Sequence, residues 1–437
     1  MNAADLAARL VAGGMPPTEL PAKTRLFETA LDGLRRLGHR DPEAAWWVPG
    51  RLEVFGKHVD YAGGHALVAP LPAGFTVVGA RTSGDSIQIL DARNGELAVD
   101  PDRATTQIGW QQYARVVASR LARNFPGSRR GVAIAFASDL PRASGMSSSS
   151  ALVVSVARAL IRLWEIDRRS EWPANVRRDE DLATLLACIE NGSSFRDLRG
   201  DGGVGTQGGS EDHTAMILGR HGHLAYCTFV PLRRLDEIAV PAEWVFVSAF
   251  SGVPASKTGA VRERYNRLSG GVQALVDLWN RHEPPAVSLA AALESGHDAP
   301  DRLLELINAS SVPSWSSEAL AQRLEHFRIE DALTQSAAEA FRQADVQALT
   351  ELAAASQSAA DRLLGNQIDA TRRLVERARA RGAFAASAFG AGFGGSVWAL
   401  TRAEEAARFT QGWQSGLLGT GPSSIQLDVF PGRPPNG

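Results

Sequence analysis

Four consecutive serines stand where a strand-like segment gives way to a helix-like one, in Pro141-Arg-Ala-Ser-Gly-Met-Ser-Ser-Ser-Ser-Ala151. Small residues let the backbone wrap closely around an anion, and the amides at a helix N-terminus point toward it. Serine hydroxyls can add hydrogen bonds or a ligand to Mg²⁺. Because one serine would be enough to cap a helix, the run of four favours a phosphate-binding loop.

A cluster of polar side chains follows a short apolar segment in Pro49-Gly-Arg-Leu-Glu-Val-Phe-Gly-Lys-His-Val-Asp-Tyr-Ala-Gly-Gly64. The apolar residues indicate a strand, after which Lys57, His58 and Asp60 would project from a turn. Hydrogen-bonding groups fixed on a turn suit a polyol ligand. On spacing alone, the segment also fits a hairpin with solvated charges, or a purely structural His58.

Two glycine-rich stretches permit a close approach of the backbone to a ligand. Ser387-Ala-Phe-Gly-Ala-Gly-Phe-Gly-Gly-Ser396 lies between two strand-like segments and is either a tight hairpin or a functional loop. A strand rather than a helix follows it, which argues against a dinucleotide fingerprint. Gly200–Gly209 leads into Ser210-Glu-Asp-His213, where a carboxylate could serve as a general base, a metal ligand or simply a solvated charge.

Several other matches fail. Ser256-Lys-Thr258 lacks the glycines of a Walker A loop. His39-Arg-Asp41 resembles the start of a protein-kinase catalytic loop, but Trp46 replaces its asparagine and no Asp-Phe-Gly occurs. The histidines show no metal-ligand spacing, and Cys188 and Cys227 are too few for a zinc cage or a disulfide framework.

The elements that must position these motifs indicate an α+β protein, with a strand-rich half and a helix-rich half. We expect the boundary near Pro231–Pro241 and a helix-rich segment from Ser256 to about Arg381. Strands are predicted at Ala45–Val48, Arg51–Phe55, Phe75–Ala80, Ser86–Leu90, Val132–Ala137, Leu224–Val230, Trp244–Phe250, Ala385–Phe389, Val397–Thr401 and Ile425–Phe430. Helices are predicted at Thr24–Leu37, Gln111–Asn124, Ser148–Ile166, Asp181–Glu190 and Glu404–Ser415.

The composition is that of an ordinary globular protein. Its 437 residues predict two or three domains, and the 44 % hydrophobic share provides ample core. A net charge of -2 gives no support for a nucleic-acid or membrane surface. The sequence has neither a signal peptide nor an apolar run long enough to span a membrane, and its two cysteines fit a cytoplasmic location. Of the 46 basic residues, only Lys23, Lys57 and Lys257 are lysines.

In their order along the chain, the motifs resemble those of the GHMP kinases, and within them the galactokinases. Pro49–Gly64 is similar to the galactokinase turn that grips the sugar, and Pro141–Ala151 to the family's phosphate loop. Phe389-Gly-Ala-Gly-Phe-Gly-Gly-Ser-Val-Trp-Ala-Leu400 resembles its C-terminal glycine motif. Gly209-Ser-Glu-Asp-His213 looks like Gly-Ile-Met-Asp-Gln, which holds the catalytic aspartate. With a further sugar-side segment around Tyr265, the resemblance covers almost the whole chain.

The resemblance implies a two-domain α+β fold, with a ribosomal-protein-S5-like domain at 1–235 and a ferredoxin-like domain at 236–437. It implies an ATP-dependent sugar 1-kinase that transfers the γ-phosphate of ATP to the anomeric hydroxyl of a monosaccharide, with Mg²⁺ as cofactor. The expected partners are the monosaccharide and ATP, without nucleic acid or membrane, and we expect a monomer.

The resemblance also implies roles for individual residues. Asp212 would accept the proton of the anomeric hydroxyl, and Arg51 would keep that aspartate ionised and stabilise the transferring phosphoryl group. Glu190 and the hydroxyl of Ser149 would hold Mg²⁺. The sugar site would comprise Lys57, His58, Asp60, Gly209 and Tyr265, and the phosphates would be bound by Gly145, Ser147, Ser148, Ser149 and Ser150.

Lys57 departs from the family pattern, because galactokinases carry there a glutamate that contacts the hexose at its 6-hydroxyl. Exchanging an acceptor for a three-donor cation should change which sugar is accepted. Our hypothesis is a substrate with an anionic group at that end, such as a uronic acid, or one without that contact. Alternatively, Lys57 pairs with Glu53 or another nearby acid. Two further residues depart from the family pattern: Glu53 stands where the sugar-gripping turn has asparagine, and Ala143 stands where the phosphate loop has glycine.

A function of a different class is also open at this point. Some relatives of galactokinases act in transcriptional control, so the chain could be a non-catalytic sensor of sugar and ATP. The intact phosphate loop, together with Asp212 and Arg51, favours an enzyme, because a sensor need not keep the base.

Overall fold

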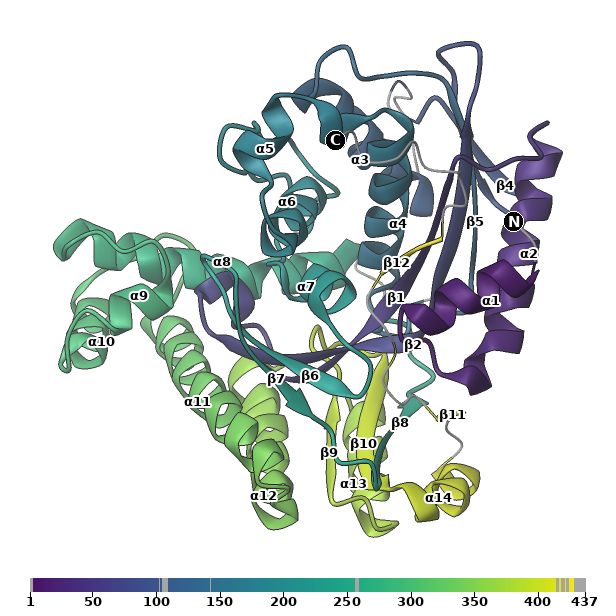
Figure 1. Ribbon diagram of the computed structural model, residues 1–437. Coiled ribbons are helices and arrows are strands. Elements are labelled where there is room, and N and C mark those ends of the chain that lie inside the picture. The colour runs from purple at the N-terminus through teal and green to yellow at the C-terminus, as the bar shows by residue number, and fades with distance from the viewer. Residues whose placement is uncertain are drawn as a thin grey trace.

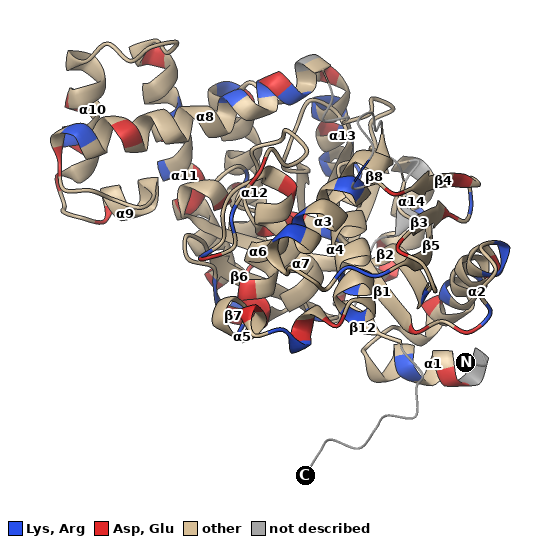
Figure 2. Cartoon of the chain, turned by 90° about the horizontal axis from the view of Figure 1, so that it is seen from above, with Lys and Arg blue, Asp and Glu red and all other residues tan. Residues whose placement is uncertain are grey.

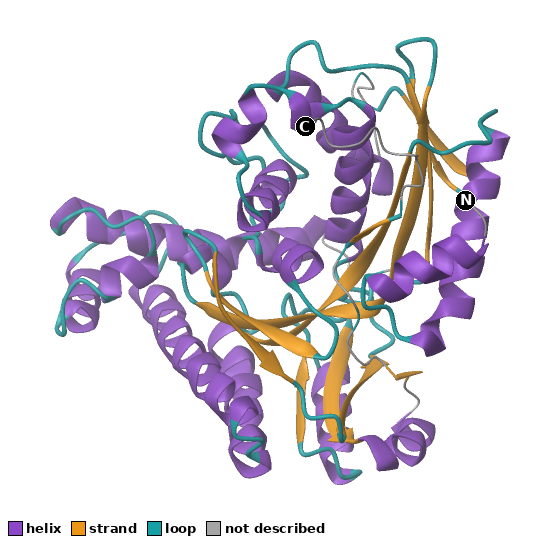
Figure 3. Cartoon of the chain, in the orientation of Figure 1, coloured by secondary structure: helices purple, strands orange, loops and turns teal. Residues whose placement is uncertain are grey.

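Figure 1 shows a computed structural model of the chain, which describes residues 3–101, 103, 109–141, 143–255, 259–413, 416–417, 421 and 424–427. Lys257 and the end of the strand expected at Ile425–Phe430 therefore lie outside the described residues. Two sheets, of eight and four strands, are surrounded by helices (Figure 3). The expected α+β class is confirmed.

The larger sheet carries most of the residues predicted to do chemistry. Its central path, in spatial order, is β12 (Ile425–Gln426), β1 (Ala44–Phe55), β2 (His65–Arg81), β5 (Val132–Ser138), β3 (Ile87–Asp91) and β4 (Glu96–Val99). From β2 it continues to β6 (His223–Thr228) and β7 (Arg233–Ala239). The pairs are antiparallel except β3 with β5, which is parallel.

The strand β1 is longer than the sequence predicts, because Pro49-Gly50 bends it without ending it. The pairing with β2 shifts register between Pro49 and Arg51. Such a bulge re-aims the side chains that follow it. β2 likewise begins ten residues earlier than the predicted Phe75, although prolines usually mark strand ends. Arg51 therefore lies on a continuous strand immediately after an irregularity.

Helices cover both faces of the larger sheet. On one face lie α1 (Ala3–Ala12) and α2 (Leu20–Arg36), packed against Trp47 and Val78. The neighbouring residues Val48 and Val77 point into the other core, as the two-residue period of a strand requires. That second core is covered by α3 (Trp110–Asn124), α4 (Ser148–Leu163), α6 (Asp179–Asn191) and α7 (Glu211–Leu218).

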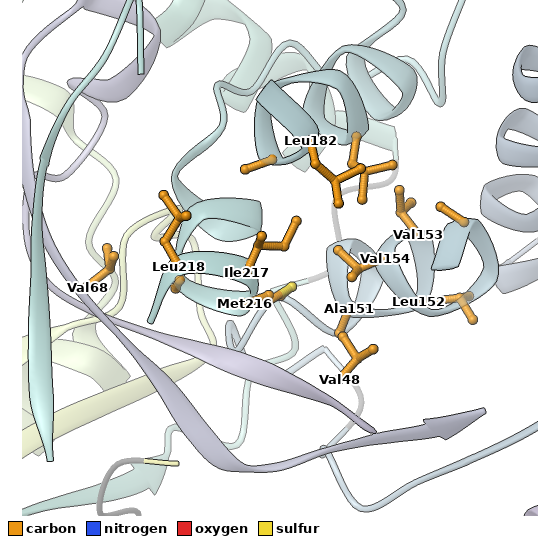
Figure 4. Close-up of a cluster of buried hydrophobic side chains, with 14 of the residues drawn as sticks. Val48, Val68, Ala151, Leu152, Val153, Val154, Leu182, Met216, Ile217 and Leu218 are labelled. Atoms are coloured by element: carbon orange, nitrogen blue, oxygen red, sulfur yellow. The ribbon is translucent and has the colours of Figure 1, made fainter. Parts of the chain in front are cut away.

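The second core fixes two helix starts beside each other. Figure 4 shows Val154 of α4, Leu182 of α6 and Met216 of α7 converging in one apolar cluster, and all three are nearly inaccessible to solvent. Burying a side chain of this size contributes about 1.5–3 kcal/mol. This packing places the N-termini of α4 and α7, which carry Ser150 and Asp212, against β1.

The smaller sheet follows β7 along the chain. Its strand order is β11 (Gly416–Leu417), β8 (Trp244–Phe250), β10 (Ser396–Arg402) and β9 (Ala385–Ala388). Phe409 and Val375 bring α14 (Ala406–Trp413) and α13 (Asp369–Ala380) onto the core of this sheet. The other helices are α5 (Glu171–Asn175), α8 (Gly259–His282), α9 (Leu289–Leu293), α10 (Ala299–Ala309), α11 (Ser317–Arg342) and α12 (Val346–Ala359).

The larger sheet draws strands from both predicted domains. Residue 235 lies inside β7, which pairs with β6. Near the other end of the chain, β12 pairs with β1, where Gln426 opposes Trp46. The segment Pro231–Pro241, expected to be a boundary, is thus mainly a strand of this sheet. The division at 235/236 stays a prediction.

Both signs of charge are interspersed along the elements (Figure 2), in keeping with the net charge of -2. Among the described residues, no helix combines the length and the apolar character needed to span a bilayer.

Candidate active site

The turn after β1 has an unusual backbone. Gly56 and His58 adopt positive φ angles of 108° and 58°. For a residue other than glycine this costs about 1–3 kcal/mol and persists only where the surroundings enforce it. Here α11 does so: Glu330 Oε1 accepts hydrogen bonds from the amides of Gly56 and Lys57 at 3.0 and 3.1 Å, and Arg323 donates to the carbonyl of His58.

The side chain of Lys57 is not brought to the other predicted sugar-site residues. It is fully buried, and its Nζ donates to Ser356 Oγ at 2.8 Å and lies 3.9 Å from Glu330 Oε1. This is the ion-pair alternative, with Glu330 as the acid in place of Glu53. The sugar contact expected of Lys57 is therefore corrected: the buried carboxylate on α11 attracts the ammonium away from the cavity.

The remaining predicted sugar-site residues line one cavity. His58 lies close to two tyrosines, with Nδ1 2.8 Å from the hydroxyl of Tyr61 and its ring 5.3 Å from that of Tyr265 on α8. The cavity is lined by Arg51, Glu53, His58, Asp60, Tyr61, Ser150, Ala187, Glu190, Asn191, Thr206, Gly208, Gly209, Glu211, Asp212, His213, Tyr265, Gly390 and Ala391.

Asp60 is held in this cavity wall by backbone amides. Its Oδ1 accepts from the amide of Tyr61 at 2.8 Å, and its Oδ2 from the amide of Glu211 at 3.1 Å. A Cβ on Gly209 would lie 2.3 Å from Asp60 Oδ2, so only glycine fits there. Burial raises the pKa of Asp60 to about 6, against the opposing effect of the two amide hydrogen bonds.

Asp212 lies in the first turn of α7 and contacts Arg51, its predicted partner, and Ser150, one of the predicted phosphate-binding serines. Its Oδ1 accepts a hydrogen bond from Arg51 Nε at 2.6 Å, and its Oδ2 accepts one from Ser150 Oγ at 3.3 Å. The guanidinium favours the ionised carboxylate. The geometry brings together the two residues predicted to be catalytic, and suits Asp212 to accept a proton.

Arg51 is surrounded by more negative charge than Asp212 alone supplies. Glu211 Oε1 lies 3.5 Å from its Nε, and Glu53 Oε2 lies 3.6 Å from its Nη2. Burial lowers the pKa of Arg51, but the charges of Asp212, Glu211 and Glu53 outweigh it and raise the pKa overall. The pKa of Glu211 lies well above its ordinary value, because of burial and then the charge of Glu53.

The serine-rich segment lies at the N-terminus of α4, as predicted. Gly145 and Ser147 have positive φ angles of 83° and 56°, and α4 starts at Ser148. These residues and Ser149 line a second cavity of about 600 Å³, together with an edge-to-face pair of Trp110 and Phe136. Helix amides beside an aromatic wall suit a nucleotide, with its phosphates at the helix.

The two cavities share a boundary. Arg51 and Ala391 line both, whereas Ser150 lines only the first. Ala391 belongs to the glycine-rich segment between β9 and β10, where Gly394 and Gly395 have positive φ angles of 131° and 80°. That segment is thus both a tight hairpin and part of the cavity walls. A group at this boundary would face the Arg51 guanidinium.

The predicted metal ligands line different cavities. Glu190 lines the first cavity and Ser149 the second. Glu190 Oε2 lies 3.2 Å from His213 Nε2 but has no hydrogen-bond partner among the described residues. An available carboxylate oxygen and a hydroxyl fit Mg²⁺, which usually takes one or two protein ligands plus phosphates and water. The described residues hold no group of three or more His, Cys, Asp or Glu arranged for a metal ion.

Several site residues escaped prediction. The sequence motifs assign no role to Glu53 or Glu211, although their positions, two residues after Arg51 and directly before Asp212, are a usable signal. His213 belongs to the motif around Asp212 and Ala391 to the glycine-rich segment Ser387–Ser396, but neither motif implies a role for them. Arg323 belongs to a long helix with no motif, so its contact with the sugar-side turn had no signal in the sequence.

Three sequence profiles match this chain. Residues 35–81 match the galactokinase galactose-binding signature. Residues 112–197 match the N-terminal domain of the GHMP kinases, and residues 337–417 match their C-terminal domain. The galactose-binding signature covers β1, the turn and β2, and the N-terminal profile covers the phosphate loop.

Similar proteins and structures cover most of the chain. A galactokinase of Chloroflexus aggregans is 29 % identical over 90 % of this chain and 93 % of its own length. One of Lactobacillus helveticus is 25 % identical, over 83 % and 87 %. The crystal structure of Lactococcus lactis galactokinase complexed with galactose has a TM-score of 0.74 at 20 % identity, covering 93 % of this chain and 100 % of that one. At that identity the structural match shows the fold.

Proposed function

This chain belongs to the GHMP kinases, and we propose that it is a galactokinase-like enzyme that transfers the γ-phosphate of ATP to the anomeric hydroxyl of a monosaccharide. The observation that carries the proposal is the position of Arg51, which lines both cavities and donates to Asp212 at 2.6 Å. A sugar in the first cavity and ATP in the second would meet at this residue.

Asp212 would act as the general base. Its carboxylate would take the proton of the anomeric hydroxyl as that oxygen attacks the γ-phosphorus. The bond between the γ-phosphorus and the bridging oxygen would break, and ADP would leave with the electron pair. Arg51 Nη1, which has no partner among the described residues, would donate to the transferring phosphoryl group. Positioning and charge stabilisation of this kind dominate phosphoryl transfer.

The phosphates of ATP would lie at the start of α4. The amides after Gly145 and the hydroxyls of Ser147, Ser148, Ser149 and Ser150 would bind them. Glu190 and Ser149 would hold Mg²⁺, whose charge offsets that of the phosphate oxygens when it is bound. Trp110 and Phe136 would form one wall of the base site.

We infer a neutral monosaccharide, held by His58, Asp60, Gly209 and Tyr265. Five carboxyl side chains line the sugar cavity, and Arg51 is the one Lys or Arg among the described residues that line it. An anionic sugar would be repelled there, whereas sugar hydroxyls donate readily to carboxylates. The uronic-acid alternative rested on Lys57, whose ammonium points elsewhere. Galactose is the first substrate to try, because the relatives named above are galactokinases.

Three further expectations belong to the proposal. The chain would act as a cytoplasmic monomer, in keeping with its two free cysteines. It would act without nucleic acid or membrane, since its charge is nearly balanced. Residues 1–235 and 236–437 would be its two domains.

The test is a coupled assay of ADP release from ATP and Mg²⁺, with galactose, arabinose, glucose, galacturonate and glucuronate as acceptors. We expect galactose or another neutral sugar to be turned over, and phosphorus NMR to place the phosphate on the anomeric oxygen. Failure of every sugar to release ADP above the background hydrolysis would contradict the proposal.

The variant Asp212→Asn separates an enzyme from a sensor. We expect kcat to fall by about 10³-fold or more, as for loss of a general base, while calorimetry still detects sugar binding. The matched control is Asp369→Asn, at an exposed residue on α13. If the wild-type chain binds sugar and ATP without turnover, the chain is a sensor.

A further inference from the structure

The acidic residues around Arg51 exceed what a single base requires. Arg51 faces Asp212, Glu211 and Glu53 at 2.6, 3.5 and 3.6 Å. All four side chains are buried or nearly so, with Glu53 and Glu211 at 3 % and 5 % exposure. Among the described residues, three acids thus face one cation, and burying such a group is expensive unless the arrangement performs a task.

The contacts of Arg51 differ from the arrangement that an arginine usually adopts with a carboxylate. Arginine and aspartate tend to form two parallel hydrogen bonds. Here only Nε donates to Asp212, while Nη2 is nearest to Glu53, and Asp212 Oδ2 accepts from Ser150 instead. The electrostatic attraction between Glu53 and Nη2 opposes a bidentate pair between the guanidinium and both oxygens of Asp212.

The carboxylate of Glu53 lies against a glycine from the other half of the chain. A Cβ on Gly390, in the glycine-rich segment, would lie 1.9 Å from Glu53 Oε2. The absence of a side chain at Gly390 therefore leaves the room that the carboxylate of Glu53 occupies. Its Oε1 is buried and has no hydrogen-bond partner among the described residues. Its charge is therefore directed to Arg51.

We propose that Glu53 and Glu211 are positioning residues, which hold Arg51 turned toward the path of the phosphoryl group and prevent it from closing on Asp212. The inference rests on the proposed kinase activity. In this arrangement Arg51 Nη1 makes no hydrogen bond among the described residues, and only one oxygen of Asp212 accepts from the guanidinium.

The two glutamates contribute differently. Burial and the charge of Glu53 raise the pKa of Glu211 well above its ordinary value, with Asp60 and Asp212 adding to the effect and Arg51 opposing it. Glu53 is the acid that faces Nη2 of Arg51, and Glu211 is the acid that faces its Nε.

The experiment compares Glu53→Gln and Glu211→Gln with the wild type. The control is Glu325→Gln, a half-exposed residue of α11 that pairs only with Arg328 among the described residues. The readouts are kcat and KM for sugar and ATP, and the nitrogen NMR signal of Arg51 Nε. We expect Glu53→Gln to lower kcat about tenfold, with KM for the sugar within about threefold. Glu211→Gln should also lower kcat and shift the Arg51 Nε signal, by less than Glu53→Gln, because Glu211 lies beside Nε, which Asp212 already holds.

Gly390→Ala provides a second route to the same change, because its methyl group must displace the carboxylate of Glu53. It should reproduce the loss of kcat and the shift of the Arg51 Nε signal seen in Glu53→Gln. The proposal is overturned if Glu53→Gln or Gly390→Ala leaves both kcat and that signal at the wild-type value, or if Glu211→Gln leaves both unchanged. The NMR signal does not depend on turnover. If the wild-type chain were inactive on every sugar, the proposed function would be contradicted, but the effect of the variants on the position of Arg51 could still be measured.

Discussion

Arg51 and Lys57 are buried cations on the same strand and turn, yet they belong to opposite kinds of environment. Arg51 faces three acids and lines two cavities. Lys57 meets one acid, Glu330, and one hydroxyl, Ser356, and is sealed from solvent. The first environment has surplus negative charge beside a space that a ligand can enter, whereas the second is balanced and closed.

The difference distinguishes a reactive site from a structural one. A balanced buried pair holds two segments together, and breaking it by removing one partner costs about 3–5 kcal/mol. A surplus of buried charge next to a cavity is tolerated where a substrate or a reaction uses it. The following predictions test this distinction.

The largest effect is expected from Arg51→Lys. The variant keeps the charge among the three acids but loses the planar fork of donors. We expect kcat to fall by about 10²-fold or more, with the melting temperature within a few degrees of the wild type. Steady-state kinetics and calorimetry would measure the two effects. A variant that melts early but keeps its kcat would place Arg51 with Lys57 as structural.

The next effect is expected from Lys57→Met. Removing the ammonium leaves Glu330 buried without its cation, so the free energy of unfolding should fall by about 3–5 kcal/mol. The folded variant should keep kcat within about threefold, because the Nζ atom does not reach the cavity. Urea denaturation and kinetics below the transition would check both. A loss of kcat without a loss of stability would show that Lys57 acts in the active site rather than in the structure.

A smaller effect is expected from pH. Burial raises the pKa of Asp60 to about 6, so about one-tenth of its carboxyl groups are ionised at pH 5. If the carboxylate binds the sugar, kcat/KM should fall about tenfold between pH 7.5 and 5. In Asp60→Asn, kcat/KM should be low and should lack this step.

The same pKa shift separates this activity loss from acid unfolding. Because the pKa of Asp60 is higher in the folded than in the unfolded chain, protonation between pH 7 and 5 favours the folded chain. This group therefore adds stability as the pH falls through that window. A melting temperature that drops in parallel with kcat/KM would contradict the assignment to Asp60.

The smallest net effect is expected from the double variant Lys57→Met/Glu330→Gln. The glutamine oxygen can still accept from the amides of Gly56 and Lys57, while the uncompensated charge is removed. We expect the unfolding free energy to return to within about 1–2 kcal/mol of the wild type. Additive losses in the double variant would show that the ion pair is not the source of the instability.

Much of the fold and the site was predictable because its signals are local. The serine run and the polar segment each lie within a few residues of sequence. The first predicted the start of a helix and the second a turn after a strand, and the structure contains both. The start of β2 and the strand β7 were missed, because prolines near them indicate breaks and their pairing with other strands outweighs that local preference.

The sequence by itself determined the family, the α+β class and the pairing of a phosphate loop with an acid and an arginine. Only the tertiary structure decided where Lys57 points, since its acid, Glu330, lies 273 residues farther along the chain. It also decided that Glu53 and Glu211 gather around Arg51. A buried charge is directed by whichever opposite charge the fold brings within a few ångströms, and distance along the sequence carries no information about that.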